Sequence, residues 1–228
     1  MYRQPLLRVK ALTRLLQDIN NSGDGGIYAE LIRNRAFQYS DNYPVSLAGW
    51  HALHCSSLAL NRLDTPLSDA LPVSVTVTPS KNSSSSSSSS AGLFNDGYWG
   101  IDVRVQNYTG SFWVHGAYEG VFTADLRSAV DGEVFGSVEV ESRAVDGEWV
   151  EHEFVLVPDV DAPSSNNTFA LTFDAAGLGG ESLDFNLISL FPPTYKGRKN
   201  GLRVDIAEAL HELHPVRYLY YSRSNGGC

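Results

Sequence analysis

The sequence predicts a mostly β protein, specifically an antiparallel β-sandwich of the jelly-roll type. Short runs in the middle of the chain alternate apolar and polar residues with a period of two, which is typical of half-buried strands. Gly, Asp, Asn or Pro separates each run from the next, as turns between strands require. Because no helical periodicity lies between these runs, an antiparallel sandwich is favoured over a parallel sheet.

Roughly nine strands are expected in this middle zone. Beside Tyr98, the residues Trp99, Ile101 and Val103 alternate with polar ones, which predicts a strand with Trp99 in the core. The other predicted strands are Ser57–Asn61, Val73–Thr78, Gly110–Tyr118, Val121–Ser128, Val134–Glu141, Trp149–Val157, Thr168–Asp174 and Leu183–Phe191. The unbroken serine run Ser83–Ser90 cannot bury apolar surface, so it predicts a flexible loop between two strands.

An amphipathic helix is expected after the strands, with Asn200 as its cap. Its apolar stripe consists of Leu202, Ile206, Leu210 and Leu213. A second apolar–polar stretch, residues 30–35, precedes the strands. We therefore expect the sandwich to interrupt a second fold whose two pieces belong together.

Composition limits the classes of partner. The formal net charge of -9 disfavours nucleic acid and anionic membranes, because neutralising phosphates requires clustered Lys and Arg. No apolar run reaches the ~20 residues of a membrane span, and no secretory signal peptide is visible. His51 and His54 have no third ligand at a recognisable interval, so no metal or other cofactor is expected. Cys55 and Cys228 do not define a disulfide framework.

Three blocks of residues are distinctive. They are Asp18–Glu30 with Asn34–Gln38, Gly97–Asp102 with Gly147–His152, and Phe191–Arg203. These blocks resemble the N-terminal part of fungal-type α-L-arabinofuranosidases of glycoside hydrolase family 51, and the resemblance covers about Leu15 to Pro215.

The resemblance implies a carbohydrate-binding-module-like, galactose-binding-like sandwich inserted between the first strand and first helix of a (β/α)8 barrel. Its expected parts are an N-terminal extension (1–16), the first-strand region (17–42), the sandwich (43–192), and the first barrel helix with a divergent C-terminus (193–228). The family hydrolyses terminal non-reducing α-L-arabinofuranosyl groups of arabinoxylan and arabinan with a retaining mechanism. Its two catalytic glutamates lie on later barrel strands, so no catalytic residue is assigned in this chain, which is expected to be an incomplete fragment.

Two positions depart from the family pattern. Gln17 occupies the place of a glutamate that helps to bind arabinose, and its amide can form hydrogen bonds but carries no charge. After Pro215 the family continues with an Arg-Phe-Pro-Gly-Gly-Asn-like turn, whereas this chain continues differently to Cys228. A shifted reading frame or mis-spliced gene would explain the second difference.

Some candidate substrate-binding residues are implied by the resemblance, and others are indicated by the residue pattern of the sandwich. The resemblance implies Gln17 and Asn20 in the barrel mouth. In the sandwich, Trp113 alternates with buried-type neighbours and is the candidate exposed platform for a sugar ring. A polar set beside an aromatic ring consists of Tyr98, Asp102 and Arg104. Glu139 and Glu141 share one strand face in the manner of a glycosidase pair, but a solvated face is the favoured interpretation.

Arabinose-containing plant polysaccharides are the expected partners, and an extracellular location is implied by the resemblance alone. Four glycosylation triplets begin at Asn20, Asn82, Asn107 and Asn166. Two alternatives to the enzyme stay open. One is a non-catalytic carbohydrate-binding module that uses Trp113 or Tyr98, and the other is a decayed or wrongly predicted gene product.

Overall fold

The computed structural model describes residues 27–38, 44–54, 56–80 and 90–212. The chain divides into two compact units, Glu30–Pro193 and a smaller unit that joins Met1–Ala29 to Thr194–Cys228. The predicted extension 1–16 and most of the serine run lie outside the described residues.

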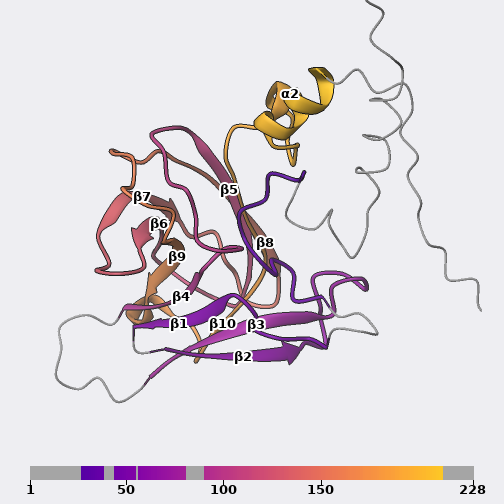
Figure 1. Cartoon of the computed structure of the whole chain (residues 1–228). Helices are drawn as coiled ribbons and strands as arrows, with labels where there is room; N and C mark the ends of the chain where they lie inside the picture. The colour runs from indigo at the N-terminus through magenta and orange to yellow at the C-terminus, as the bar shows by residue number, and fades with distance from the viewer. Residues whose placement is uncertain (1–26, 39–43, 55, 81–89, 213–228) are drawn as a thin grey trace, which may run out of the picture. The chain divides into compact units, whose positions relative to one another are not determined.

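The larger unit is an antiparallel β-sandwich, which confirms the predicted fold class (Figure 1). Its two five-stranded sheets have the orders β1-β4-β9-β6-β7 and β2-β3-β10-β5-β8. The strands are β1 (Trp50–His54), β2 (Ser56–Arg62), β3 (Val73–Pro79), β4 (Ser90–Asn95), β5 (Tyr108–His115), β6 (Val121–Ser128), β7 (Val134–Glu141), β8 (Trp149–Leu156), β9 (Asn167–Asp174) and β10 (Leu183–Phe191). Most connections cross from one sheet to the other, as in a jelly roll.

Aromatic side chains from both sheets fill the core. Phe122 of β6 lies 5.2 Å from Phe112 of β5 and 6.1 Å from Phe185 of β10, measured between ring centroids. His152 of β8 is also fully buried and stacks on Phe112 at 5.2 Å. Burial lowers the pKa of His152, whose Nε2 accepts a hydrogen bond from the Arg143 backbone N–H at 2.9 Å. The core thus keeps this imidazole neutral.

The strand predicted around Trp99 is wrong. Gly97 and Gly100 both have positive φ, at +63° and +85°, and they place Trp99 in a turn where 96% of its surface is exposed. Ile101 and Val103 are buried as predicted, but they form no strand: the Ile101 N–H donates to the carbonyl of Asn167 at the start of β9, and the Val103 carbonyl accepts the N–H of Ala162 in a loop. Trp99 is therefore a surface residue and not a core one.

Residues 30–38 also differ from the expected division of the chain at residue 42. They belong to the sandwich unit, because Ile32 and Phe37 are buried in its core. The backbone N–H of Leu31 donates to the Leu190 carbonyl at 3.0 Å, and that of Ile188 donates to Arg35 at 3.2 Å. This segment lies along the end of β10.

The smaller unit is described for residues 27–29 and 194–212. The Ala29 N–H donates to the Gly201 carbonyl at 3.1 Å, and the Arg203 N–H donates to Ile27 at 2.9 Å. The residues before and after the sandwich are thus bonded to each other. The predicted helix is present as α2 (Val204–Glu212), but Asn200 is not its cap, because it adopts φ +51° four residues before the helix begins.

Candidate functional site

Of the six predicted substrate-binding residues, Gln17 and Asn20 lie outside the described residues. Tyr98, Asp102 and Arg104 lie in the loop between β4 and β5. Trp113 lies on β5 itself. The structure thus divides the described candidates between a loop and a strand face.

Within the loop, Asp102 and Arg104 are brought together. Arg104 Nη2 lies 3.0 Å from Asp102 Oδ1, and its Nη1 lies 3.6 Å from Asp161 Oδ2. The hydrogen bond and charge of Asp102 raise the pKa of Arg104. All three side chains are exposed, so these ion pairs contribute little to stability.

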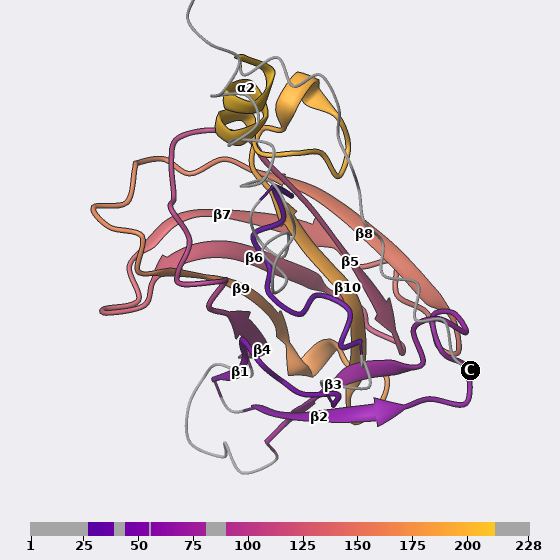
Figure 2. The ribbon, with the colours of Figure 1, turned by 45° about the vertical axis from the view of Figure 1, so that its right-hand side comes forward.

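Trp113 lies on the outer face of the sheet β2-β3-β10-β5-β8, because Phe112 and Val114 on either side of it are fully buried. The predicted alternation in this strand is therefore confirmed. Trp113 is half-buried, and it is paired across the sheet with Glu151 of β8 and Asn186 of β10. Figure 2 shows these three strands side by side.

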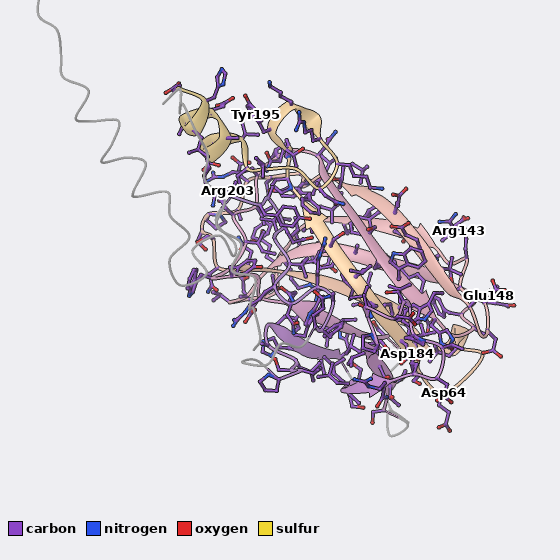
Figure 3. All side chains as sticks on the ribbon, turned by 90° about the vertical axis from the view of Figure 1, so that its right-hand side faces the viewer. Asp64, Arg143, Glu148, Asp184, Tyr195 and Arg203 are labelled. Carbon is purple, nitrogen blue, oxygen red and sulfur yellow. The ribbon has the colours of Figure 1, made fainter. Side chains whose placement is uncertain are left out.

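A second row of side chains crosses the same outer face. His115 of β5 is paired with Trp149 of β8 and with Asp184 of β10, and Asp184 is paired with Thr76 of β3. The His115 and Trp149 rings lie 5.3 Å apart. The Thr76 hydroxyl donates to Asp184 and accepts from Asn61 Nδ2 at 2.7 Å. Asp184 is labelled in Figure 3.

Sequence reasoning missed this second row. The alternation in β8 places Trp149 and Glu151 on one face, so local sequence could have identified Trp149. Only the register of four strands brings Asp184 and Thr76 beside it. Together the two rows present flat aromatic rings beside carboxylate, hydroxyl and amide groups, which is the combination that binds sugars.

Among the described carboxyl groups of the sandwich, Glu30 has the largest shift in pKa. Its Oε1 accepts the backbone N–H of Leu190 at 2.8 Å and of Ile32 at 3.1 Å, while Oε2 lies 3.2 Å from Arg35 Nη1. Desolvation raises its pKa from 4.5 to about 7, although these bonds and Arg35 oppose the shift. All its contacts are to the protein's own backbone and Arg35, so we assign it a structural role.

Other predicted features are simple to place. Glu139 and Glu141 are exposed on the edge strand β7, which confirms the solvated-face interpretation. Asn107 and Asn166 are exposed, whereas Asn20 and Asn82 lie outside the described residues. Over the part of the chain that the structure describes, no three His, Cys, Asp or Glu side chains are grouped to hold a metal ion. The helices described there lack the length and apolar character of a membrane span.

Comparison with known proteins identifies relatives of this chain. No protein-family model matches it. It is 33% identical over 199 residues to α-L-arabinofuranosidase A of Aspergillus kawachii and to the probable enzyme of Aspergillus flavus. These matches cover 87% of this chain, which spans only 30% of the length of each relative.

A solved structure gives the same result. An arabinose-bound GH51 α-L-arabinofuranosidase superimposes with a TM-score of 0.74 and 38% identity, covering 86% of this chain and 31% of that one. Sequence and fold therefore agree over most of the described residues. The chain is homologous to the N-terminal part of the α-L-arabinofuranosidases of glycoside hydrolase family 51.

Proposed function

We propose that this chain supplies the N-terminal part of an α-L-arabinofuranosidase that removes terminal non-reducing α-L-arabinofuranosyl groups from arabinoxylan and arabinan. The observation that supports this most is the 38% identity and TM-score of 0.74 to an arabinose-bound family 51 enzyme. An extracellular location, where such polysaccharides occur, belongs to the same proposal.

The place of the sandwich in that enzyme follows from chain order. We propose that residues 17–29 contribute the first barrel strand and that α2 is the first barrel helix, with the sandwich between them. Active sites of (β/α)8 barrels are built from the loops that join each strand to the following helix. The sandwich is then an insertion in the first of these loops, and we propose that Gln17 and Asn20 contact arabinose.

The first test is a chimera. The 228-residue chain alone is expected to show no turnover of an aryl α-L-arabinofuranoside, because later barrel strands supply the acid/base and the nucleophile. Replacing the matching 30% of the Aspergillus kawachii enzyme with this chain should give a hydrolase.

Within the chimera, Gln17→Glu should lower KM, because a carboxylate accepts stronger hydrogen bonds from sugar hydroxyls than an amide does. Turnover by the isolated chain, or a folded but inactive Gln17→Glu chimera, would contradict the proposal.

A second candidate function is carbohydrate binding without catalysis, and the outward position of Trp113 on the sheet favours it. Titration of the chain with arabinoxylan oligosaccharides should give binding that Trp113→Ala weakens about tenfold, because the indole face covers the C–H face of a sugar. Trp99→Ala, which removes an exposed tryptophan of the loop between β4 and β5, is the matched control. Unchanged affinity of Trp113→Ala would exclude this face as the platform.

A further inference from the structure

The outer face of the sheet β2-β3-β10-β5-β8 carries a second tryptophan and an ordered carboxylate that the functions above leave without a role. We propose that Trp149 and Asp184, together with Trp113, form a binding site for a neutral oligosaccharide, with the two indoles under neighbouring sugar rings. This inference rests on the proposed carbohydrate function of the sandwich. To the platform formed by Trp113 it adds Trp149 as a second ring and Asp184 as an acceptor for a sugar hydroxyl, and it specifies that the ligand is neutral.

The two tryptophans are suitably spaced for adjacent sugar units. Trp113 is opposite Glu151 and Trp149 is opposite His115, so the two indoles are diagonal neighbours on adjacent antiparallel strands. Such neighbours have side chains about 7 Å apart, within reach of one another's rings. Both are half-buried, so each ring is supported by the sheet while part of its surface stays in solvent.

Trp149 is held in place before any ligand binds. Its indole Nε1 donates to the Thr65 carbonyl at 3.0 Å, and its ring packs against the His115 ring. A side chain that is already fixed loses little rotamer entropy when a ligand stacks on it. Trp99 lies in a turn with 96% of its surface exposed, which makes it a poorer platform and a useful control.

Asp184 is placed to accept a sugar hydroxyl. The Thr76 hydroxyl, itself bonded to Asn61, holds one carboxylate oxygen of Asp184. The other oxygen, Oδ2, lies 3.7 Å from His115 Nδ1, which is longer than an ordinary hydrogen bond. Only 14% of the Asp184 side chain is exposed, so in the proposed site a ligand O–H meets this carboxylate at its exposed edge.

The charges of this face select a neutral ligand. Glu151 is opposite Trp113, Glu153 follows on the same strand face, and Asp184 lies across β5 from them. These three carboxyl groups outnumber the guanidinium beside them, that of Arg143, whose Nη2 donates to the Glu151 carbonyl at 2.8 Å. The excess negative charge disfavours an anionic polysaccharide, while the carboxylate oxygens accept hydrogen bonds from the hydroxyls of a neutral one. Arabinoxylan fragments therefore suit this face, and polyuronic acids do not.

Calorimetric titration of the full chain with arabinoxylan oligosaccharides tests the site, with oligogalacturonate as the anionic comparison. We expect wild type to bind only the neutral probe, Trp149→Ala to weaken binding about tenfold, and Asp184→Asn to weaken it several-fold. Trp99→Ala is the matched control and should bind like wild type. Because Trp149→Ala removes packing against His115, the isosteric Asp184→Asn variant provides a second measurement that leaves the sheet intact.

Three outcomes would overturn the site. They are no binding by wild type, a loss in Trp99→Ala as large as in Trp149→Ala, or full affinity of both Trp149→Ala and Asp184→Asn. Hydrolysis of the small aryl arabinofuranoside by the chimera does not involve this face, so it should survive all these variants. Loss of binding with an active chimera therefore overturns only the oligosaccharide site, whereas an inactive chimera overturns the enzymatic proposal.

Discussion

Replacing Phe122 with alanine should lower the free energy of unfolding by about 3–5 kcal/mol, the range measured for buried Phe→Ala changes. Phe122 is fully buried on β6, and its ring centroid lies 5.2 Å from Phe112 and 6.1 Å from Phe185 in the opposite sheet. It also packs against Tyr118 at 4.7 Å and Phe173 at 6.2 Å. Its removal leaves a cavity where the two sheets meet, which rigid strands cannot close.

Urea unfolding followed by tryptophan fluorescence would measure this loss. Val121→Ala is the matched control, because Val121 precedes Phe122 on the same strand, points outward and is 37% exposed. It should change stability by no more than about 0.5 kcal/mol. A Phe122→Ala variant within about 1 kcal/mol of wild type would mean that the surrounding rings repack, against the close packing described above.

Local patterns predicted strands that alternate in burial, such as β7, and also short apolar runs that are buried almost throughout, such as β9 and β10. The bounds of β6, β7 and β10 agree with the prediction to the residue, because turn residues flank each run at both ends. In contrast, β1 was missed because only Trp50 among its five residues is buried. The pairing of this edge strand with β4 depends on tertiary contacts that no local pattern encodes.

Glycines explain two further differences. β4 was missed because Gly92 reads as a strand breaker, yet a Cβ at that position would overlap the Leu171 carbonyl of the neighbouring strand β9. Gly97 and Gly100 have the opposite effect. Their positive φ angles allow a turn within a run whose alternation resembles that of a strand. Trp99 lies in this turn and is exposed instead of buried in the core.

The candidate site was predictable only where one strand determines it. Trp113 follows from alternation within β5 alone. The row Trp149, His115, Asp184 and Thr76 comes from four strands separated by long stretches of sequence, and it requires the register of β8, β5, β10 and β3. A one-residue shift in any pairing would turn that strand's contribution to the other face, so composition and spacing cannot identify the row.

The stability of the sandwich should fall as the pH rises from about 4.5 to about 7, and Glu30 should be a main cause. Burial raises its pKa to about 7 in the folded protein, whereas the unfolded chain has the ordinary value of 4.5. Between these two pH values the folded state binds the proton and the unfolded state does not. The stabilisation by protonation is therefore complete below about pH 4.5 and is lost as the pH rises through about 7. The shift corresponds to ~3 kcal/mol.

Glu30→Gln removes this titration while keeping an oxygen that can accept the N–H groups of Ile32 and Leu190. Urea unfolding of both proteins at pH 5 and pH 8 should show a decrease for wild type that is about 2–3 kcal/mol larger than for the variant, because part of the effect is already lost at pH 5. His152 acts in the opposite direction, because burial lowers its pKa, but its contribution is common to both proteins and cancels in the comparison. Equal pH dependence of the two would show that Arg35 and the two backbone N–H groups keep the Glu30 carboxylate charged despite its burial.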